Sequence, residues 1–157
     1  MSDANRLKEV VIDEAGLAAA TPDIAHERRI AVFDLCEKSD FAVPGAAEGP
    51  YALTIGIREG RMALNVKAAD GAEAANHQLS LTPLRRLMRD YFKICDSYNA
   101  ALRDATPSQI EAIDMGRRGL HNEGAELMTE ALAGKIEVDF ETARRLFTLL
   151  CAIHPRT

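Results

Sequence analysis

Two alternating segments joined by a two-residue turn constrain the fold of this chain more than any other feature. They are residues 51–58 (YALTIGIR) and 61–67 (RMALNVK), with Glu59-Gly60 between them. A loop of two residues fixes which positions of the two strands face each other. Three apolar pairs should then lie on one face: Ile57–Met62, Ile55–Leu64 and Leu53–Val66. The other face is mostly small or polar, so the pattern predicts an antiparallel hairpin with one buried face.

The dipeptide Thr-Pro is found three times, at Thr21-Pro22, Thr82-Pro83 and Thr106-Pro107. A threonine side chain can cap the free N–H groups at the start of a helix, and proline is favoured at the first helical position. Each dipeptide therefore predicts a helix start, and we expect helices up to about Lys38, Asp104 and Gly134, the last being a plausible glycine just after a helix end. Asp139 is the expected cap of a fourth helix over 140–153, whose apolar spacing predicts a central core helix.

These elements predict an α+β fold, with a mainly antiparallel sheet of about four strands packed against about four helices. Besides the hairpin we expect a strand over 7–12, buried on both faces, and a strand over 76–81 with His77, Leu79 and Leu81 facing inward. Residues 41–50 are expected to form a loop, and 136–138 a short extended link. The length of 157 residues predicts a single domain, 1–157, with residues 1–5 disordered.

The segment 110–132 (IEAIDMGRRGLHNEGAELMTEAL) has helical periodicity, but polar side chains interrupt its apolar face. Asp114, Arg117 and His121 lie on successive turns of that face, and Arg118 is also within reach of Asp114. A carboxylate there should favour the charged forms of arginine and histidine. Three interpretations stay open: a ligand or catalytic site in which Arg117 holds an anion and His121 transfers a proton, a buried polar network, or an interface with a second subunit. Whether 116–124 stays one helix, despite three glycines, is also open.

A short basic ridge lies on the helix expected after Pro83. Arg85, Arg89 and Lys93 follow one another at steps of four residues, and Asp90 and Asp96 partly offset their charge. This ridge is either a solvated helix face or a site for an anion or a partner.

Known catalytic and metal motifs are absent from the sequence, including GxGxxG, GxxxxGK[ST], HExxH and GxSxG. The motif HNEGAE at 121–126 suggests a metal site at first. On a helix, however, His121 and Glu123 project about 200° apart, and Glu126 lies about 140° from His121. We therefore predict no metal and no cofactor. Cys36, Cys95 and Cys151 form no CxxC pair and are expected to be reduced, buried thiols.

The net charge of −5 disfavours broad binding to nucleic acid or to an anionic membrane surface. No apolar run approaches the roughly 18 residues of a membrane span, and the N-terminus has no signal-peptide core. We expect a cytosolic protein that binds neither nucleic acid nor membranes.

The segments GLHNEGAEL (119–127) and VDFETARRLFTLLCAIH (138–154), together with FDLCE (33–37) and PLRRL (83–87), resemble a small bacterial family of about 160 residues with no assigned activity. The resemblance covers nearly the whole chain. It implies a bacterial cytosolic protein and carries no functional residue to this sequence.

The lack of a catalytic motif and the mixed polarity of 110–132 favour a non-enzymatic binding or regulatory protein, acting as a homodimer or with a protein partner. The alternative is a small enzyme or anion-binding protein for a small anionic ligand. It would use Arg117 and His121, with help from Arg118, Arg144 or Arg145.

Overall fold

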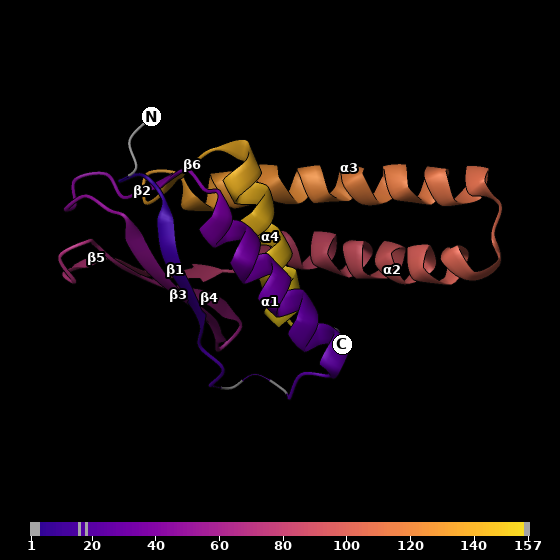
Figure 1. Cartoon of the computed structure of the whole chain (residues 1–157), viewed down its shortest axis with the longest axis horizontal. Helices are drawn as coiled ribbons and strands as arrows, with labels where there is room; N and C mark the ends of the chain where they lie inside the picture. Colours follow the sequence, from indigo (N-terminus) through magenta and orange to yellow (C-terminus); the bar gives the residue numbers. More distant parts are fainter. Residues whose placement is uncertain (1–3, 16, 18, 156–157) are drawn as a thin grey trace.

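The computed structural model describes residues 4–15, 17 and 19–155. The elements within these residues are, in chain order, β1 (Leu7–Ile12), α1 (Pro22–Glu37), β2 (Phe41–Ala42), β3 (Tyr51–Arg58), β4 (Arg61–Lys67), β5 (Glu73–Ser80), α2 (Thr82–Asp104), α3 (Pro107–Leu132), β6 (Glu137–Val138) and α4 (Phe140–Ile153). The predicted α+β fold is confirmed. Figure 1 shows the sheet at one end of the molecule, α1 and α4 in the middle, and the hairpin of α2 and α3 reaching away from the sheet.

The main sheet has the strand order β1-β3-β4-β5. The predicted hairpin is confirmed with its register, since Ile57 pairs with Met62, Ile55 with Leu64 and Leu53 with Val66. Its turn has φ values of 53° at Glu59 and 74° at Gly60. Two consecutive positive φ values are typical of the tight turn that matches the twist of a β-hairpin.

The edge strands differ in part from the prediction. β1 pairs in parallel with β3 at one edge of the sheet, and its Val11 is 45% exposed, so the prediction of burial on both faces is wrong. A strand in a mixed sheet needs apolar cover on one face only. At the other edge, β5 begins earlier than expected, at Glu73. His77 and Leu79 do face inward, half-buried, whereas Leu81 already belongs to the helix junction.

The caps of α1 and α3 are as predicted, but that of α2 is not. Thr21 accepts a hydrogen bond from the Ile24 N–H, and Thr106 forms a reciprocal capping box with Gln109. In α2 the cap position is Leu81, and Thr82 is already helical. Because the Leu81 side chain is fully buried, it anchors the junction, while the Ser80 hydroxyl accepts from the Thr82 N–H at 3.2 Å.

Residues 41–50 were predicted to form a loop, and this prediction is wrong in part, because Phe41–Ala42 forms β2. This short strand pairs antiparallel with β6, where only an extended link was expected. The Phe41 N–H also donates to the Asn5 carbonyl at 3.1 Å, so Asn5 is held in place. The rest of the predicted disordered segment includes residues 1–3, which lie outside the described residues.

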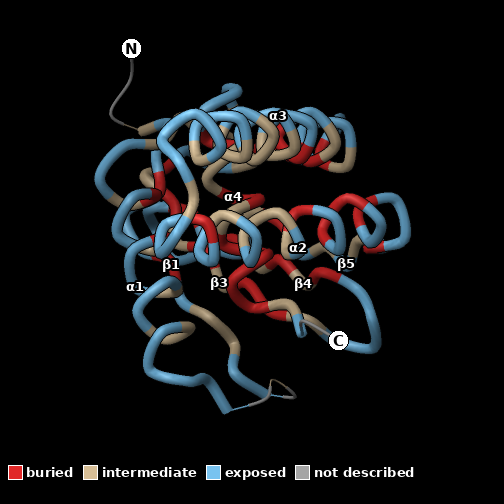
Figure 2. The backbone as a smooth tube through the Cα atoms, turned by 90° about the vertical axis from the view of Figure 1, so that its right-hand side faces the viewer, coloured by how far each residue is buried: buried red, intermediate tan, exposed pale blue. Residues whose placement is uncertain are grey.

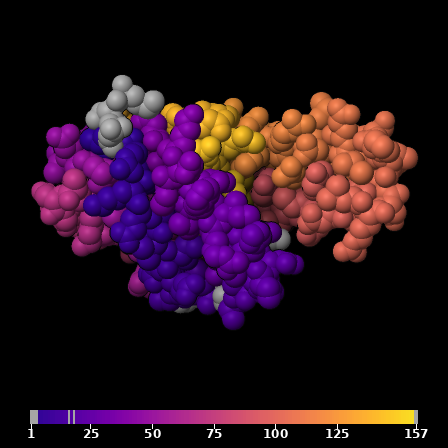
Figure 3. All heavy atoms as spheres, in the orientation of Figure 1, coloured from indigo at the N-terminus to yellow at the C-terminus, as the bar shows by residue number. Residues whose placement is uncertain are grey.

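The helices form a layer around α4. α3 is one continuous helix through Gly116, Gly119 and Gly124, which settles the question left open by the sequence. α4 packs against both α1 and α3 and is buried over much of its length, as predicted for a central helix. In Figure 2 α4 is largely red behind the hairpin of α2 and α3, whose outer surface is mostly pale blue, and Figure 3 shows the hairpin projecting from the body. No helix in the described part of the chain is long and apolar enough to cross a membrane.

Candidate functional site

Asp114 on α3 gathers the two arginines that follow it. Its Oδ1 lies 2.6 Å from Nη2 and 3.1 Å from Nε of Arg117, and its Oδ2 lies 3.0 Å from Nη2 of Arg118. The hydrogen bond from Arg117 holds the pKa of Asp114 below its usual range. Burial disfavours the charged guanidinium of Arg117, but Asp114 outweighs this effect and raises its pKa. Arg117 also stacks over Tyr98, with its Cζ 4.7 Å from the ring centroid, so its guanidinium is engaged on two sides.

His121 is not part of this ion-pair cluster. Its Nε2 lies 2.5 Å from the Thr148 hydroxyl on α4, and its ring packs against Tyr91 and Phe147 at centroid distances of 5.5 and 6.0 Å. Burial, followed by repulsion from Arg144, lowers the pKa of His121 from 6.5 to about 4. The prediction that its charged form would be favoured is therefore wrong. Asp114 lies two helical turns, about 10 Å, from His121 along α3. The imidazole instead packs against aromatic rings and lies near the positive charge of Arg144, and both surroundings disfavour its charged form.

Arg117 and His121 line different cavities. Arg117 lines a cavity of about 270 Å³ together with Tyr98 and Cys95, whereas His121 lines one of about 300 Å³ together with Arg144 and Arg145. Thr148 lies in the wall of both. The structure thus brings His121 near Arg144 and Arg145, while Arg117, one turn away on α3, lines the neighbouring cavity and also disfavours the charged imidazole.

The His121 cavity contains one unsatisfied group. The Arg144 Nε is buried without a hydrogen-bond partner among the residues described, and its Nη1 lies 3.7 Å from a Glu141 carboxylate oxygen. Arg145, in contrast, donates to the Lys38 carbonyl. The acidic residues of the 121–126 motif, Glu123 and Glu126, are exposed, as the helical wheel indicates. Across the described ranges, no three His, Cys, Asp or Glu side chains gather closely enough to hold a metal ion.

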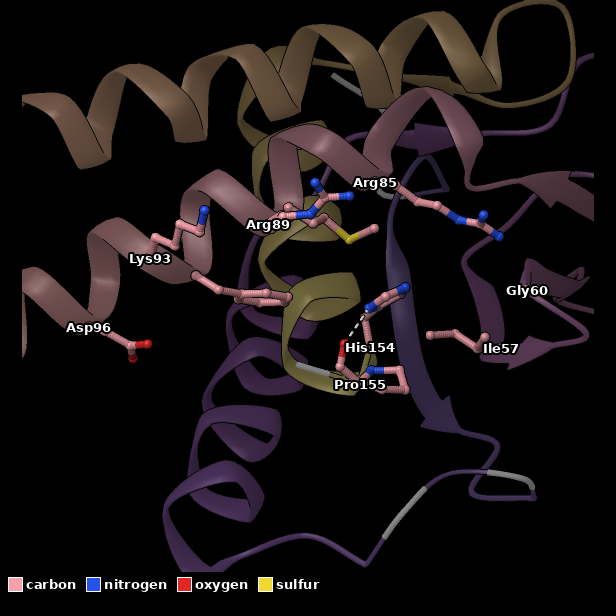
Figure 4. Close-up of a pocket in the computed structure, with 10 residues that line it drawn as sticks. Ile57, Gly60, Arg85, Arg89, Lys93, Asp96, His154 and Pro155 are labelled. Carbon is pink, nitrogen blue, oxygen red and sulfur yellow. Dashed lines mark hydrogen bonds between the residues drawn. The ribbon is translucent and has the colours of Figure 1, made fainter. Parts of the chain in front are cut away.

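The basic ridge of α2 borders a larger cavity, of about 530 Å³. Figure 4 shows it between α2, the turn between β3 and β4, and the C-terminal end of α4. The lining residues are Ile57, Gly60, Arg85, Met88, Arg89, Phe92, Lys93, Asp96, His154 and Pro155. Apolar side chains therefore form the inner surface, and the cations of the ridge stand at its rim.

Polar groups lie on two opposite walls of this cavity, Arg85 on α2 and His154 at the end of α4. The Arg85 guanidinium lies so close to Gly60 that a Cβ on this glycine would be 3.0 Å from Nη2. His154 faces Arg85 and Arg89 from the opposite side, and its Nδ1 lies 2.8 Å from the Pro155 carbonyl, to which it can donate. Arg85, Arg89 and Lys93 form no ion pair within the described part of the chain.

The sequence showed only half of this second site. The four-residue spacing of the ridge was visible, and both of its interpretations were left open. His154 and Ile57 were missed because they come from α4 and β3, and no local pattern indicates that these elements meet α2. An apolar floor below a cationic ridge is a property of the tertiary arrangement.

Comparisons with known proteins give a family for the chain. The sequence profile of an uncharacterised protein family (UPF0262) matches residues 4–156. A UPF0262 protein of Rhodopseudomonas palustris (strain TIE-1) is 55% identical over 150 residues, which cover 96% of this chain and 92% of the relative. A UPF0262 protein of Rhizobium etli (strain CIAT 652) is 53% identical over 151 residues, 96% of each chain. No solved structure matches the chain.

Proposed function

Since this chain belongs to the uncharacterised family UPF0262, we propose its function from the geometry: it is a non-enzymatic binding protein of the bacterial cytosol that holds a small anionic ligand in the cavity beside α2. One observation carries the proposal. Three cations at one rim, Arg85, Arg89 and Lys93, border an apolar cavity and form no ion pair in the part of the chain that is described.

The charge pattern supports an anion rather than a cation as the ligand. The chain as a whole carries a net charge of −5, yet this rim places three positive charges over a helical rise of about 12 Å. Guanidinium groups that form no ion pair within the protein can make charge-assisted, bidentate hydrogen bonds to carboxylates and phosphates. The cavity volume of about 530 Å³ lies within the range of small-molecule sites, about 300–1,000 Å³.

The polar groups on α3 favour a structural role over chemistry. With a pKa of about 4, His121 is neutral at pH 7, so it lacks the acidic proton of an imidazolium and is a weak base. Arg117 is held by Asp114 and stacked on Tyr98. These contacts support the buried polar network among the three interpretations of this helix face.

The alternative, an enzyme or anion site at His121, has one observation in its favour. The Arg144 Nε is buried without a hydrogen-bond partner in the described ranges and lines the same cavity as His121 and Arg145. An anion there would pair with the charge of the Arg144 guanidinium. Saturating the Arg85→Glu, Arg89→Glu chain with phosphate and following the His121 ring signals by NMR tests this alternative, because binding in the His121 cavity would still shift them when the rim beside α2 has lost its two arginines.

The proposed function is tested by comparing two doubly substituted chains of equal charge. Arg85→Glu with Arg89→Glu reverses two of the three charges of the rim, whereas Arg86→Glu with Arg103→Glu changes two exposed arginines of α2 outside the cavity. Differential scanning fluorimetry with a panel of carboxylates and organic phosphates should show stabilisation of the wild type and of the second variant only. Equal stabilisation of all three chains would refute the assignment of the site.

A further inference from the structure

We infer that the ligand of the cavity beside α2 is an amphipathic organic anion: a carboxylate or phosphate head attached to an elongated apolar body. This inference rests on the proposed function, because it takes the same cavity as the binding site. It adds that the ligand has a charged head and an apolar body, and it says at which end of the cavity the head lies.

The head belongs at the end of the cavity formed by Arg85, Arg89 and His154. The two guanidinium groups come from one wall, and the imidazole faces them from the other (Figure 4). Because the His154 Nδ1 can donate to the Pro155 carbonyl, Nε2 of an uncharged ring carries a lone pair and accepts hydrogen bonds. The donors for a head group with several oxygens are therefore the two guanidinium groups, and the imidazole only closes the opposite wall.

The opposite end of the cavity is less favourable to an anion. There Lys93 is accompanied by Asp96, which also lines the cavity. A carboxylate at this end repels a negative head and offsets the charge of the lysine. The positive charge of the rim is therefore uncompensated only at Arg85 and Arg89.

The body of the ligand is indicated by the floor of the cavity. Ile57 and Phe92 contribute apolar surface, Met88 lies beneath it and is only 1% exposed, and Pro155 extends the surface on the far wall. An inorganic anion at the rim would leave this surface in contact with water, whereas a hydrocarbon or aromatic body would cover it. The helical rise between Arg85 and Lys93, about 12 Å, sets the length that the head and the body can occupy together.

The test separates the head from the body by titration calorimetry. Octanoate and octyl phosphate carry both parts, octan-1-ol carries only the body, and acetate and inorganic phosphate carry only the head. We expect the two octyl anions to bind at least about tenfold more tightly than the probes that lack one part. Arg89→Glu should weaken their binding about tenfold or more. Arg86, which lies three residues earlier on α2, does not line the cavity, so Arg86→Glu should leave the binding unchanged.

A second variant tests the floor. Phe92→Ala should weaken octyl phosphate and leave inorganic phosphate unchanged, and Phe92→Leu, which keeps more apolar surface, should have a smaller effect. Both variants are compared with the wild type by melting temperature to verify folding, and Phe92→Leu alone decides the point if Phe92→Ala does not fold.

The outcomes distinguish the two proposals. If inorganic phosphate and acetate bind as tightly as the octyl anions, and Arg89→Glu abolishes all of them, the anion site stands and the amphipathic ligand is refuted. If octan-1-ol binds as tightly as octanoate, the role of the head is refuted. If none of the anions binds the wild type, both the inference and the proposed function fall.

Discussion

Replacing Gly124 with alanine should destabilise the chain, although alanine is the better helix former. The backbone of α3 passes so close to α4 at this position that a Cβ would lie 2.5 Å from Cδ2 and Cε2 of Phe147 and 2.6 Å from its Cγ. Phe147 is fully buried and packs edge-on against Tyr91 at a centroid distance of 5.6 Å, so its ring has no free space into which to move. Relief of the overlap requires the two helices to separate.

The magnitude follows from two opposing effects. Overpacking a filled core costs about 1–3 kcal/mol, and three contacts this short favour the upper end of that range. The exchange of glycine for alanine within a helix returns about 1 kcal/mol. We therefore expect a net loss of about 2 kcal/mol from the free energy of unfolding for Gly124→Ala.

Gly119 provides the matched control, because it lies on the same helix and a Cβ there would have no atom within 4 Å. Gly119→Ala should gain up to about 1 kcal/mol from helix propensity alone. Urea unfolding followed by circular dichroism measures both variants, whose free energies should differ by about 3 kcal/mol. The reasoning would be refuted if Gly124→Ala were as stable as Gly119→Ala, since this result would exclude the close approach of α3 to α4.

Three further predictions concern the polar face of α3 and its surroundings. Because the pKa of His121 is lowered from 6.5 to about 4, its contribution to stability is complete above pH 6.5 and is lost as the pH falls toward 4, where the unfolded chain takes up the proton first. The loss, discounted for partial exposure of the ring, should be about 1–2 kcal/mol, and His121→Asn should flatten the curve of unfolding free energy against pH. Thr148→Val leaves the imidazole nitrogen without its partner and should cost about 1–3 kcal/mol in urea unfolding, whereas Thr148→Ser keeps the hydroxyl and should cost less. Light scattering tests the predicted homodimer. If α3 forms the interface, Met115→Glu, at a position that is 63% exposed, should give a monomer. A dimer that survives this change places the interface elsewhere.

Local patterns in the sequence predicted those parts of the fold that local contacts determine. The register of the β3–β4 hairpin follows from a two-residue turn, and the caps at Thr21 and Thr106 from neighbouring backbone groups. The pairing of β2 with β6 was missed because it joins two dipeptides from distant parts of the chain. The exposure of Val11 was missed for a related reason: its apolar sequence context is the same whether the strand is central or at an edge.

In the candidate site too, the sequence predicted contacts within one helix and missed contacts between helices. Spacings of three and four residues correctly placed Arg117 and Arg118 beside Asp114, because these contacts lie within one helix. The same spacing placed His121 on their face but could not give its surroundings, since Thr148 and Arg144 come from α4 and Tyr91 from α2. The protonation of His121 depends on these neighbours, and for this reason the prediction of its charge was wrong.

The two sets of polar residues are connected through α2. Tyr91, on the inner side of this helix, contacts His121 and Phe147, while Arg89 and Lys93, two residues to either side, line the cavity. Adjacent positions of one helix thus face the core and the cavity. The contact between His121 and Thr148 joins α3 to α4, and α4 ends at His154, which forms the opposite wall of the cavity. On this argument the residues of α3 that resemble a catalytic group hold in place the two helices that carry the proposed binding residues. A His121 variant should therefore weaken octyl anion binding only to the extent that it loosens the packing of α2 on α4, and binding should recover under conditions that restore its stability.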